Sequence, residues 1–134
     1  MSPAMMISKL LHDHPDVDLQ EGTSLFIGRE PESPDSCVTI YDTGGSEQES
    51  RLAIDEATFQ IRVRSKSYDT GYQKAGEIKS ILQSLSSVSV EQILLVGLWA
   101  SSNIAFLKRD DQDRSIFVWN GRVMTEPTNL GNRQ

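Results

Sequence analysis

The sequence predicts an α+β fold, a two-layer sandwich in which a mostly antiparallel sheet packs against one long helix and a short N-terminal helix. One long segment, 68–85, repeats apolar residues at helical spacing, and several shorter segments have the composition of strands. The sheet is the only partner large enough to bury the helix's apolar stripe. The chain has 134 residues, 37% of them hydrophobic and 24% charged. We therefore expect one domain, 1–134, with frayed residues from about position 126.

The first predicted element is a short helix over 5–12. Its apolar residues stand at positions 6, 7, 10 and 11, which is helical spacing. Pro15 is expected to end it, because proline cannot continue a helix.

Three strands are expected next. The run 24–28 is apolar, 37–41 is rich in β-branched residues, and 58–65 alternates between apolar and polar residues. The loop 29–36 contains two prolines. The loop 43–51 is polar and has glycines at positions 44 and 45. We expect both loops to become ordered only on docking to a partner.

The long helix is expected to begin near Tyr68, capped by Ser67 or Asp69. Gly71 and Gly76 each weaken a helix by up to about 1 kcal/mol relative to alanine, so they indicate close packing against a neighbour. The predicted buried stripe consists of Ala75, Ile78, Leu82 and Leu85.

The C-terminal part is predicted to be a strand meander. A polar turn over 109–114 and a second turn at Asn120-Gly121 separate its strands. The strands themselves are expected over 93–100, 104–108, 115–119 and 122–125.

The alternating strand places two arginines on one face. Arg62 and Arg64 share a face with Gln60, whereas the apolar residues of the strand occupy the other face. That face is either a solvated outer surface or a contact with an acidic surface, including that of a second copy of the chain. Arginine suits such a contact because its planar guanidinium binds carboxylates with two parallel hydrogen bonds. On the second interpretation, charge reversal at both arginines prevents assembly and leaves the monomer folded.

Composition excludes several classes of function. The chain has 13 basic and 19 acidic side chains, a net charge of −6, which disfavours tight wrapping of nucleic acid. The single cysteine, Cys37, cannot form an internal disulfide. We expect no signal peptide and no membrane span, because the longest apolar run, 93–100, is short.

Catalytic and metal sites are weakly indicated, and we expect no cofactor, no metal and no enzymatic activity. The aspartates of the turn at 110–113 lack the glycine and closing glutamate of a calcium loop. His12 and His14 have no third ligand, and nothing local activates Cys37. The remaining catalytic alternative is a metal-dependent nuclease using Asp42, Asp55 and Glu56.

A resemblance to a known family begins with the stretch FIGREPESPDSCVTIYDTGG, 26–45, which is its most specific part. It continues through FQIRVRSKSYDTGYQKAGEIKSIL, 59–82, and more faintly through KRDDQDRSIFVWNGRV, 108–123. These stretches resemble the phage minor capsid proteins of the tail-completion kind, which are similar to tail terminators of long-tailed bacteriophages. The segment 46–55 departs from the sequence pattern of the family. If this loop determines which partner is bound, the choice of partner is the property that the departure affects.

The resemblance implies a structural virion protein of the tail or neck, assembled in the host cytoplasm. It implies a homo-oligomer, a hexameric ring, that caps the head-proximal end of the tail tube. The expected partners are the tail tube protein and the head–tail connector protein, with DNA passing through the lumen without specific binding. The alternatives are a neck or head-completion adaptor of the connector, and the nuclease named above.

The candidate subunit or partner interface combines the arginine strand with the loops around it. Complementary patches are needed because a closed ring repeats one heterologous contact. The candidate residues are Arg62, Arg64, Lys66, Arg29, Glu30, Asp42, Gly44, Gly45, Glu47 and Glu49.

Overall fold

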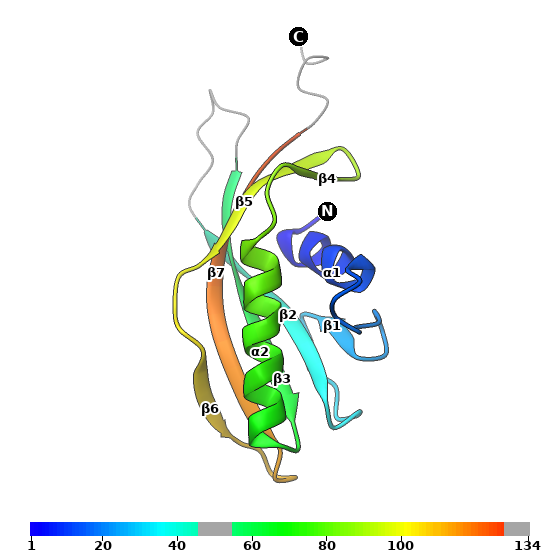
Figure 1. The fold of residues 1–134 in the computed structure, drawn as a ribbon, viewed down its shortest axis with the longest axis vertical. Helices are drawn as coiled ribbons and strands as arrows, with labels where there is room; N and C mark the ends of the chain where they lie inside the picture. Colours follow the sequence, from blue (N-terminus) through cyan, green and yellow to red (C-terminus); the bar gives the residue numbers. More distant parts are fainter. Residues whose placement is uncertain (46–54, 128–134) are drawn as a thin grey trace.

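The computed structural model describes residues 1–45 and 55–127 (Figure 1). Two helices and seven strands follow one another along this part of the chain. In order they are α1 (Pro3–Asp13), β1 (Leu25–Ile27), β2 (Cys37–Gly45), β3 (Asp55–Ser65), α2 (Tyr68–Gln83), β4 (Val88–Val90), β5 (Ile93–Ala100), β6 (Ala105–Arg109) and β7 (Ser115–Pro127).

The strands form one sheet with the order β1-β2-β3-β7-β5-β4, and β6 also pairs with β7. Only the β1–β2 pair is parallel; the other pairs are antiparallel. The central pair is β3 and β7, whose register runs from Asp55 opposite Thr125 to Ser65 opposite Ser115. The prediction of a mostly antiparallel sheet is confirmed.

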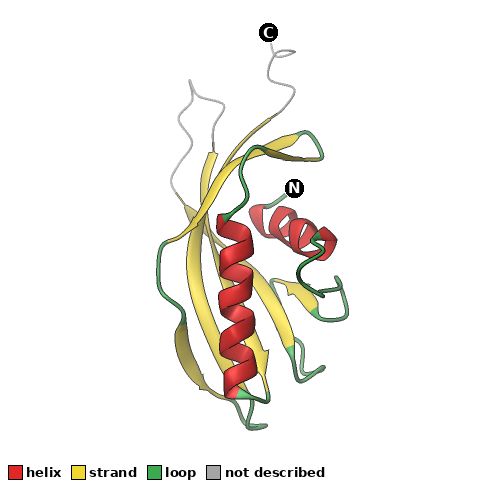
Figure 2. Cartoon of the chain, viewed as in Figure 1, coloured by secondary structure: helices red, strands yellow, loops and turns green. Residues whose placement is uncertain are grey.

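Both helices lie on the same face of this sheet. Helix α2 packs on β3, β5 and β7, whereas α1 packs on β1, β2 and β3 and touches α2. The sheet is curved, and its strands curl around the helices (Figures 1 and 2). The α+β class is therefore confirmed, but the predicted two-layer sandwich with one long helix is an inexact description of a sheet that curls around two helices.

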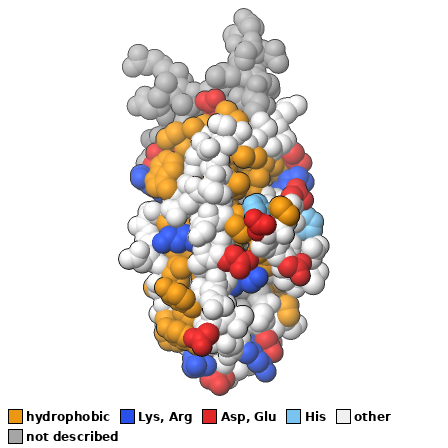
Figure 3. Space-filling model, viewed as in Figure 1, with side chains coloured by type: hydrophobic (Ala, Val, Ile, Leu, Met, Phe, Trp, Pro, Cys, Tyr) orange, Lys and Arg blue, Asp and Glu red, His pale blue; other side chains and the backbone are white. Residues whose placement is uncertain are grey.

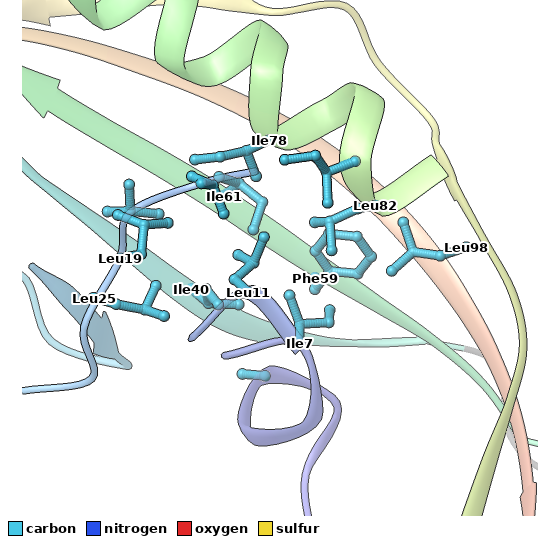
Figure 4. Packing of buried hydrophobic residues seen from close by; sticks show 14 of the residues in the cluster. Ile7, Leu11, Leu19, Leu25, Ile40, Phe59, Ile61, Ile78, Leu82 and Leu98 are labelled. Carbon is cyan, nitrogen blue, oxygen red and sulfur yellow. The ribbon is translucent and has the colours of Figure 1, made fainter. Parts of the chain in front are cut away.

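The hydrophobic core fills the space between the sheet and the helices. Side chains from α1, α2 and the inner face of the sheet converge there, with Phe59 and Ile61 of β3 at the centre (Figure 4). Phe59 and Trp119 pack edge to face, with ring centroids 5.6 Å apart. The alternation seen in the sequence of β3 follows from this packing, because one face of the strand is buried by the helices.

The ends of the helices follow the capping rules. The Ser2 hydroxyl accepts a hydrogen bond from the Met5 N–H at the start of α1, and the Ser67 hydroxyl accepts one from the Thr70 N–H at the start of α2. The predicted cap at Ser67 is thus confirmed. Neither described helix is long and apolar enough to cross a membrane.

The two glycines of α2 differ in their surroundings. A Cβ on Gly71 would lie 3.0 Å from the Phe117 ring, so this glycine permits the close approach of α2 to β7. On Gly76 the nearest atom would be Ile104 Cδ1 at 3.8 Å, an ordinary van der Waals distance. The prediction of close packing is confirmed for Gly71 and wrong for Gly76.

The predicted turn at Asn120-Gly121 is wrong, because β7 runs without a break through both residues. Gly121 lies opposite Phe59 in the β3–β7 register. A Cβ there would come within 2.5 Å of the Phe59 ring, so the glycine leaves room for a core aromatic residue. Tertiary packing, not a reversal of the chain, explains the Asn-Gly pair.

The predicted meander is one long hairpin with an interruption. Strands β5 and β6 both pair with β7, β5 with its C-terminal part and β6 with its N-terminal part. The segment 101–104 between them is held by Asn120, whose N–H donates to the Ser102 hydroxyl at 2.9 Å and whose carbonyl accepts from the Ser101 N–H at 2.8 Å.

Strand β4 was absent from the sequence prediction. It reaches β5 through a two-residue turn at Glu91 and Gln92, whose φ angles are 47° and 69°. Such turns are dominated by glycine and asparagine. A Glu-Gln pair therefore gives no turn signal in the sequence.

Candidate functional site

The arginines of β3 project from the face of the sheet that is turned away from the helices, and the loop 29–36 of the same chain covers them. Arg62 Nε donates to Glu30 Oε2 at 3.3 Å, and its Nη2 donates to Glu30 Oε1 at 3.4 Å. Arg64 Nη2 donates to the Pro34 carbonyl at 2.6 Å, and its Nε donates to the Asp35 carbonyl at 3.2 Å.

A third arginine, Arg114 at the start of β7, binds the same loop. Its Nη1 donates to the Glu32 carbonyl at 2.6 Å, and it lies 3.3 Å from Asp35 Oδ1. Its Nε donates to Asp110 Oδ2 at 2.8 Å. We call Arg62, Arg64 and Arg114, together with the loop 29–36 that they hold, the arginine clamp.

The arginine clamp gives the loop a fixed structure within one chain. Arg64 and Arg114 are only 3% and 4% exposed, and a buried guanidinium must have its N–H groups satisfied. Backbone carbonyl groups of the loop accept these hydrogen bonds, so the conformation of the loop and the burial of the arginines depend on each other. The expectation that loop 29–36 becomes ordered only on docking is therefore not met in the single chain.

Two of the predicted interface residues lie at the surface of the arginine clamp. Lys66 Nζ lies 3.4 Å from Asp35 Oδ2, in an ion pair whose side chains are 69% and 45% exposed. An exposed pair of this kind contributes little to stability. Arg29 is exposed at the start of the loop.

The other end of β2 carries three further candidates in a different setting. Asp42 Oδ1 accepts a hydrogen bond from the Ala4 N–H at 2.9 Å and so caps α1. Gly44 and Gly45 have φ angles of 96° and 128°, next to a register shift between β2 and β3. A Cβ on Gly45 would lie 2.7 Å from Ala57 Cα, so strand pairing requires a glycine there.

The predicted interface therefore divides into two groups. Arg62 lies opposite Thr39 in the β2–β3 register, so Asp42 is about 10 Å and Gly45 about 20 Å further along β2 at the usual rise of a strand. Glu47 and Glu49, like most of the segment 46–55, lie outside the described residues. The structure brings together Arg62, Arg64, Lys66 and Glu30 and leaves Asp42, Gly44 and Gly45 apart from them.

Two carboxylates of the nuclease alternative, Asp42 and Glu56, are engaged by other groups, and the side chain of the third, Asp55, lies outside the described part of the structure. Asp42 and Glu56 line a cavity of about 410 Å³, but Asp42 caps α1 and Glu56 Oε1 lies 3.0 Å from Arg122 Nη1. Within residues 1–45 and 55–127, no group of three or more His, Cys, Asp or Glu side chains is placed to hold a metal ion.

Cys37 is buried beside the arginine clamp. It lines a second cavity, of about 200 Å³, together with Arg64 and Lys74. Burial raises the pKa of its thiol, and the charge of Arg64 only partly offsets this effect. The thiol is therefore protonated near neutral pH, which argues against a nucleophilic role.

The turn between β6 and β7 is held by hydrogen bonds to the Asp110 side chain, so it is not simply a solvated hairpin tip. Asp110 Oδ1 accepts hydrogen bonds from the Gln112 and Arg114 N–H groups, both at 3.0 Å. Burial raises the pKa of Asp110, but these bonds and the Arg114 guanidinium outweigh it and lower the pKa below the usual 3.8. Sequence reasoning missed Arg114; its one local signal is the spacing of an aspartate and an arginine, four residues apart, across a turn.

Comparison with known proteins identifies a family to which the chain is similar. A family model described as "Bacteriophage tail terminator protein" matches residues 4–125. A search of curated proteins gave no match.

Proposed function

Because this chain belongs to the bacteriophage tail terminator family and is thus a structural protein of the virion, we propose that it caps the head-proximal end of the tail tube. In this proposal copies of the chain form a closed ring, commonly six-fold, that ends tube polymerisation. The ring then presents the surface to which the head connector docks, and DNA passes through its lumen. The observation that carries the proposal is the family match over 122 of the 134 residues, 4–125.

The arginine clamp supports a role in subunit or partner contact. It braces an exposed, charged loop against the outer face of the sheet with short hydrogen bonds to Arg64 and Arg114. A surface that is ordered before binding loses less conformational entropy when a partner docks. We propose that loop 29–36 makes the contact, and that Arg62 and Arg64 act by holding it in place.

The net charge of −6 also fits a ring through which DNA moves. Phosphate groups bind to clustered lysine and arginine side chains, and the three arginines of the clamp are engaged by the loop and by Asp110. We therefore expect DNA to pass without specific binding.

The proposal is tested by making phage particles without this chain and imaging their tails. A terminator predicts tails of abnormal length that carry no heads, and wild-type protein supplied in trans should restore normal particles. Tails of normal length without heads would instead indicate the connector-adaptor alternative. Normal particles that contain no copy of the chain would contradict both structural roles.

A further inference from the structure

An exposed aromatic cluster lies where the start of α2 meets β6. Tyr68 and Tyr72 of α2 are 45% and 51% exposed, and Phe106 and Leu107 of β6 are 44% and 47% exposed. Tyr68, Tyr72 and Phe106 all pack around the buried Phe117, with ring centroids 4.9, 5.8 and 5.6 Å from it. We call the four exposed residues the aromatic edge.

The aromatic edge lies on an open strand. In the described sheet β6 pairs with β7 on one side only, and all five of its residues are exposed. Unpaired strand edges that carry apolar side chains tend to recruit another chain, and soluble proteins normally blunt them. Figure 3 shows hydrophobic side chains gathered along this side of the molecule.

Charges of both signs flank the aromatic edge, and the exposed Asp69 follows Tyr68 on α2. Lys108 follows Leu107 on β6, and Lys79 stands seven residues after Tyr72, on the same face of α2. Among the salt bridges of residues 1–45 and 55–127, none involves Lys79 or Lys108. The edge therefore offers apolar area together with two cations that can pair with carboxylates.

The opposite side of the molecule is acidic. Residues 13–35 contain seven acidic side chains and a single arginine. Strand β1 ends the sheet on this side, away from β6, and acidic side chains gather there in Figure 3. We call four exposed residues between α1 and β1 the acidic edge: Asp13, Asp16, Asp18 and Glu21.

We propose that the aromatic edge of one copy docks against the acidic edge of a second copy. This inference deepens the proposed function, because a ring requires two unlike surfaces on each subunit. Charge complementarity favours a second copy of the chain as the partner. In this contact the lysines of one copy face carboxylates of the other, and the tyrosine hydroxyls can donate hydrogen bonds to those carboxylates. The loop of the arginine clamp follows β1 directly, so its start adjoins the acidic edge, whereas Arg114 binds its later residues to the β6–β7 hairpin.

Zero-length cross-linking tests the contact. Equal amounts of ¹⁴N- and ¹⁵N-labelled protein are mixed, both free and with purified tail tubes, and treated with a carbodiimide that joins lysine to carboxylate. Mass spectrometry should find mixed-isotope peptides that join Lys79 or Lys108 to the acidic edge. Absence of these peptides from both preparations overturns the inference, as do cross-links from the two lysines to the tube protein alone.

Two variants and a matched control identify the surface that is responsible. Phe106→Glu should lower the yield of mixed-isotope peptides by about tenfold or more, because it removes an aromatic anchor. Lys108→Glu alters only an exposed side chain and should lower the yield of the peptides that contain Lys79, whose amine is retained. This second variant guards against misfolding of the first. Val96→Glu introduces the same charge at a position 36% exposed on β5 and should leave the yield unchanged.

The outcomes separate this inference from the proposed function. If Phe106→Glu protein still produces normal tails in particles, the docking surface is wrong and the terminator role stands. If tails made without the chain are normal while the mixed-isotope peptides are present, the terminator role is wrong and the contact stands.

Discussion

At the scale of single residues, the decisive feature is a buried guanidinium whose Nε and Nη1 atoms both bind other residues. Arg114 is 4% exposed and binds Asp110, Asp35 and the Glu32 carbonyl. Removing one partner of a buried charge pair is costly because the other partner is left without compensation. Arg114 therefore links the tip of the β6–β7 hairpin to the loop that follows β1.

Arg114→Met should lower the free energy of unfolding by roughly 3 kcal/mol, the usual cost of breaking a buried ion pair. Denaturant titration measures this change. The matched control is Arg109→Met, because Arg109 pairs with Asp113 at 3.3 Å in an ion pair whose side chains are 49% and 86% exposed. The control should cost less than about 1 kcal/mol, and equal losses in the two variants would contradict the buried role of Arg114.

The lowered pKa of Asp110 makes part of this stability depend on pH. A carboxyl whose folded-state pKa lies below its unfolded value stabilises the fold above the unfolded pKa. Its contribution is lost as the pH falls through the folded pKa. For Asp110 the loss begins below its usual 3.8. The difference in unfolding free energy between wild type and Asp110→Asn should be constant near neutral pH and shrink below about pH 4; a constant difference down to pH 2 would be inconsistent with the lowered pKa.

At the scale of elements, Gly121 of β7 and Gly76 of α2 have opposite effects on stability. Gly121 in the middle of β7 gives space to the ring of Phe59, whereas Gly76 in α2 has only Ile104 nearby, at 3.8 Å. The strand glycine is required by tertiary packing. The helix glycine carries only its conformational cost.

Gly121→Ala should therefore destabilise the protein by roughly 1–3 kcal/mol, since it overpacks the core beside Phe59 and Trp119. Gly76→Ala should raise stability by up to about 1 kcal/mol, the difference in helix propensity. Thermal unfolding of both variants gives the comparison. Stabilisation by Gly121→Ala would mean that Phe59 can move away and that the core is loosely packed there.

At the scale of the whole molecule, two features combine: a sheet curled around two helices (Figure 1) and unlike surfaces on its two sides. The β1 side carries the acidic edge, and the β6 side carries the aromatic edge with its lysines. Unlike surfaces on opposite sides favour head-to-tail association, which closes a ring when the rotation per subunit allows it.

Association through these edges should weaken with salt. Raising the ionic strength from about 0.1 M to about 1 M shortens the Debye length from about 10 Å to about 3 Å. Sedimentation velocity, or the yield of mixed-isotope cross-links, should then show less association. Stronger association at high salt would indicate a contact that depends on the apolar side chains without the charges.

Local patterns in the chain suffice to specify the elements that depend on neighbouring residues. The periodicity of 68–83 and the cap at Ser67 specify α2, and the alternation of β3 specifies which of its faces is buried. Hydrophobic spacing and caps act over a few residues, so they can be read directly from the chain. The family resemblance was also accessible in this way, through short stretches of consecutive residues, and the match over 4–125 confirms it.

Only the tertiary structure decided which side chains are free to meet a partner. Arg62 and Arg64 alternate like surface residues, yet a loop that ends just before β2 folds back over them, and Arg114 reaches that loop from β7. Likewise, Asn120-Gly121 has the composition of a turn, but Phe59 of another strand requires the glycine. These outcomes depend on contacts between residues far apart in the chain, which local patterns do not encode. The burial of a charge or the need for a glycine is therefore settled only when segments that are far apart in the chain pack together.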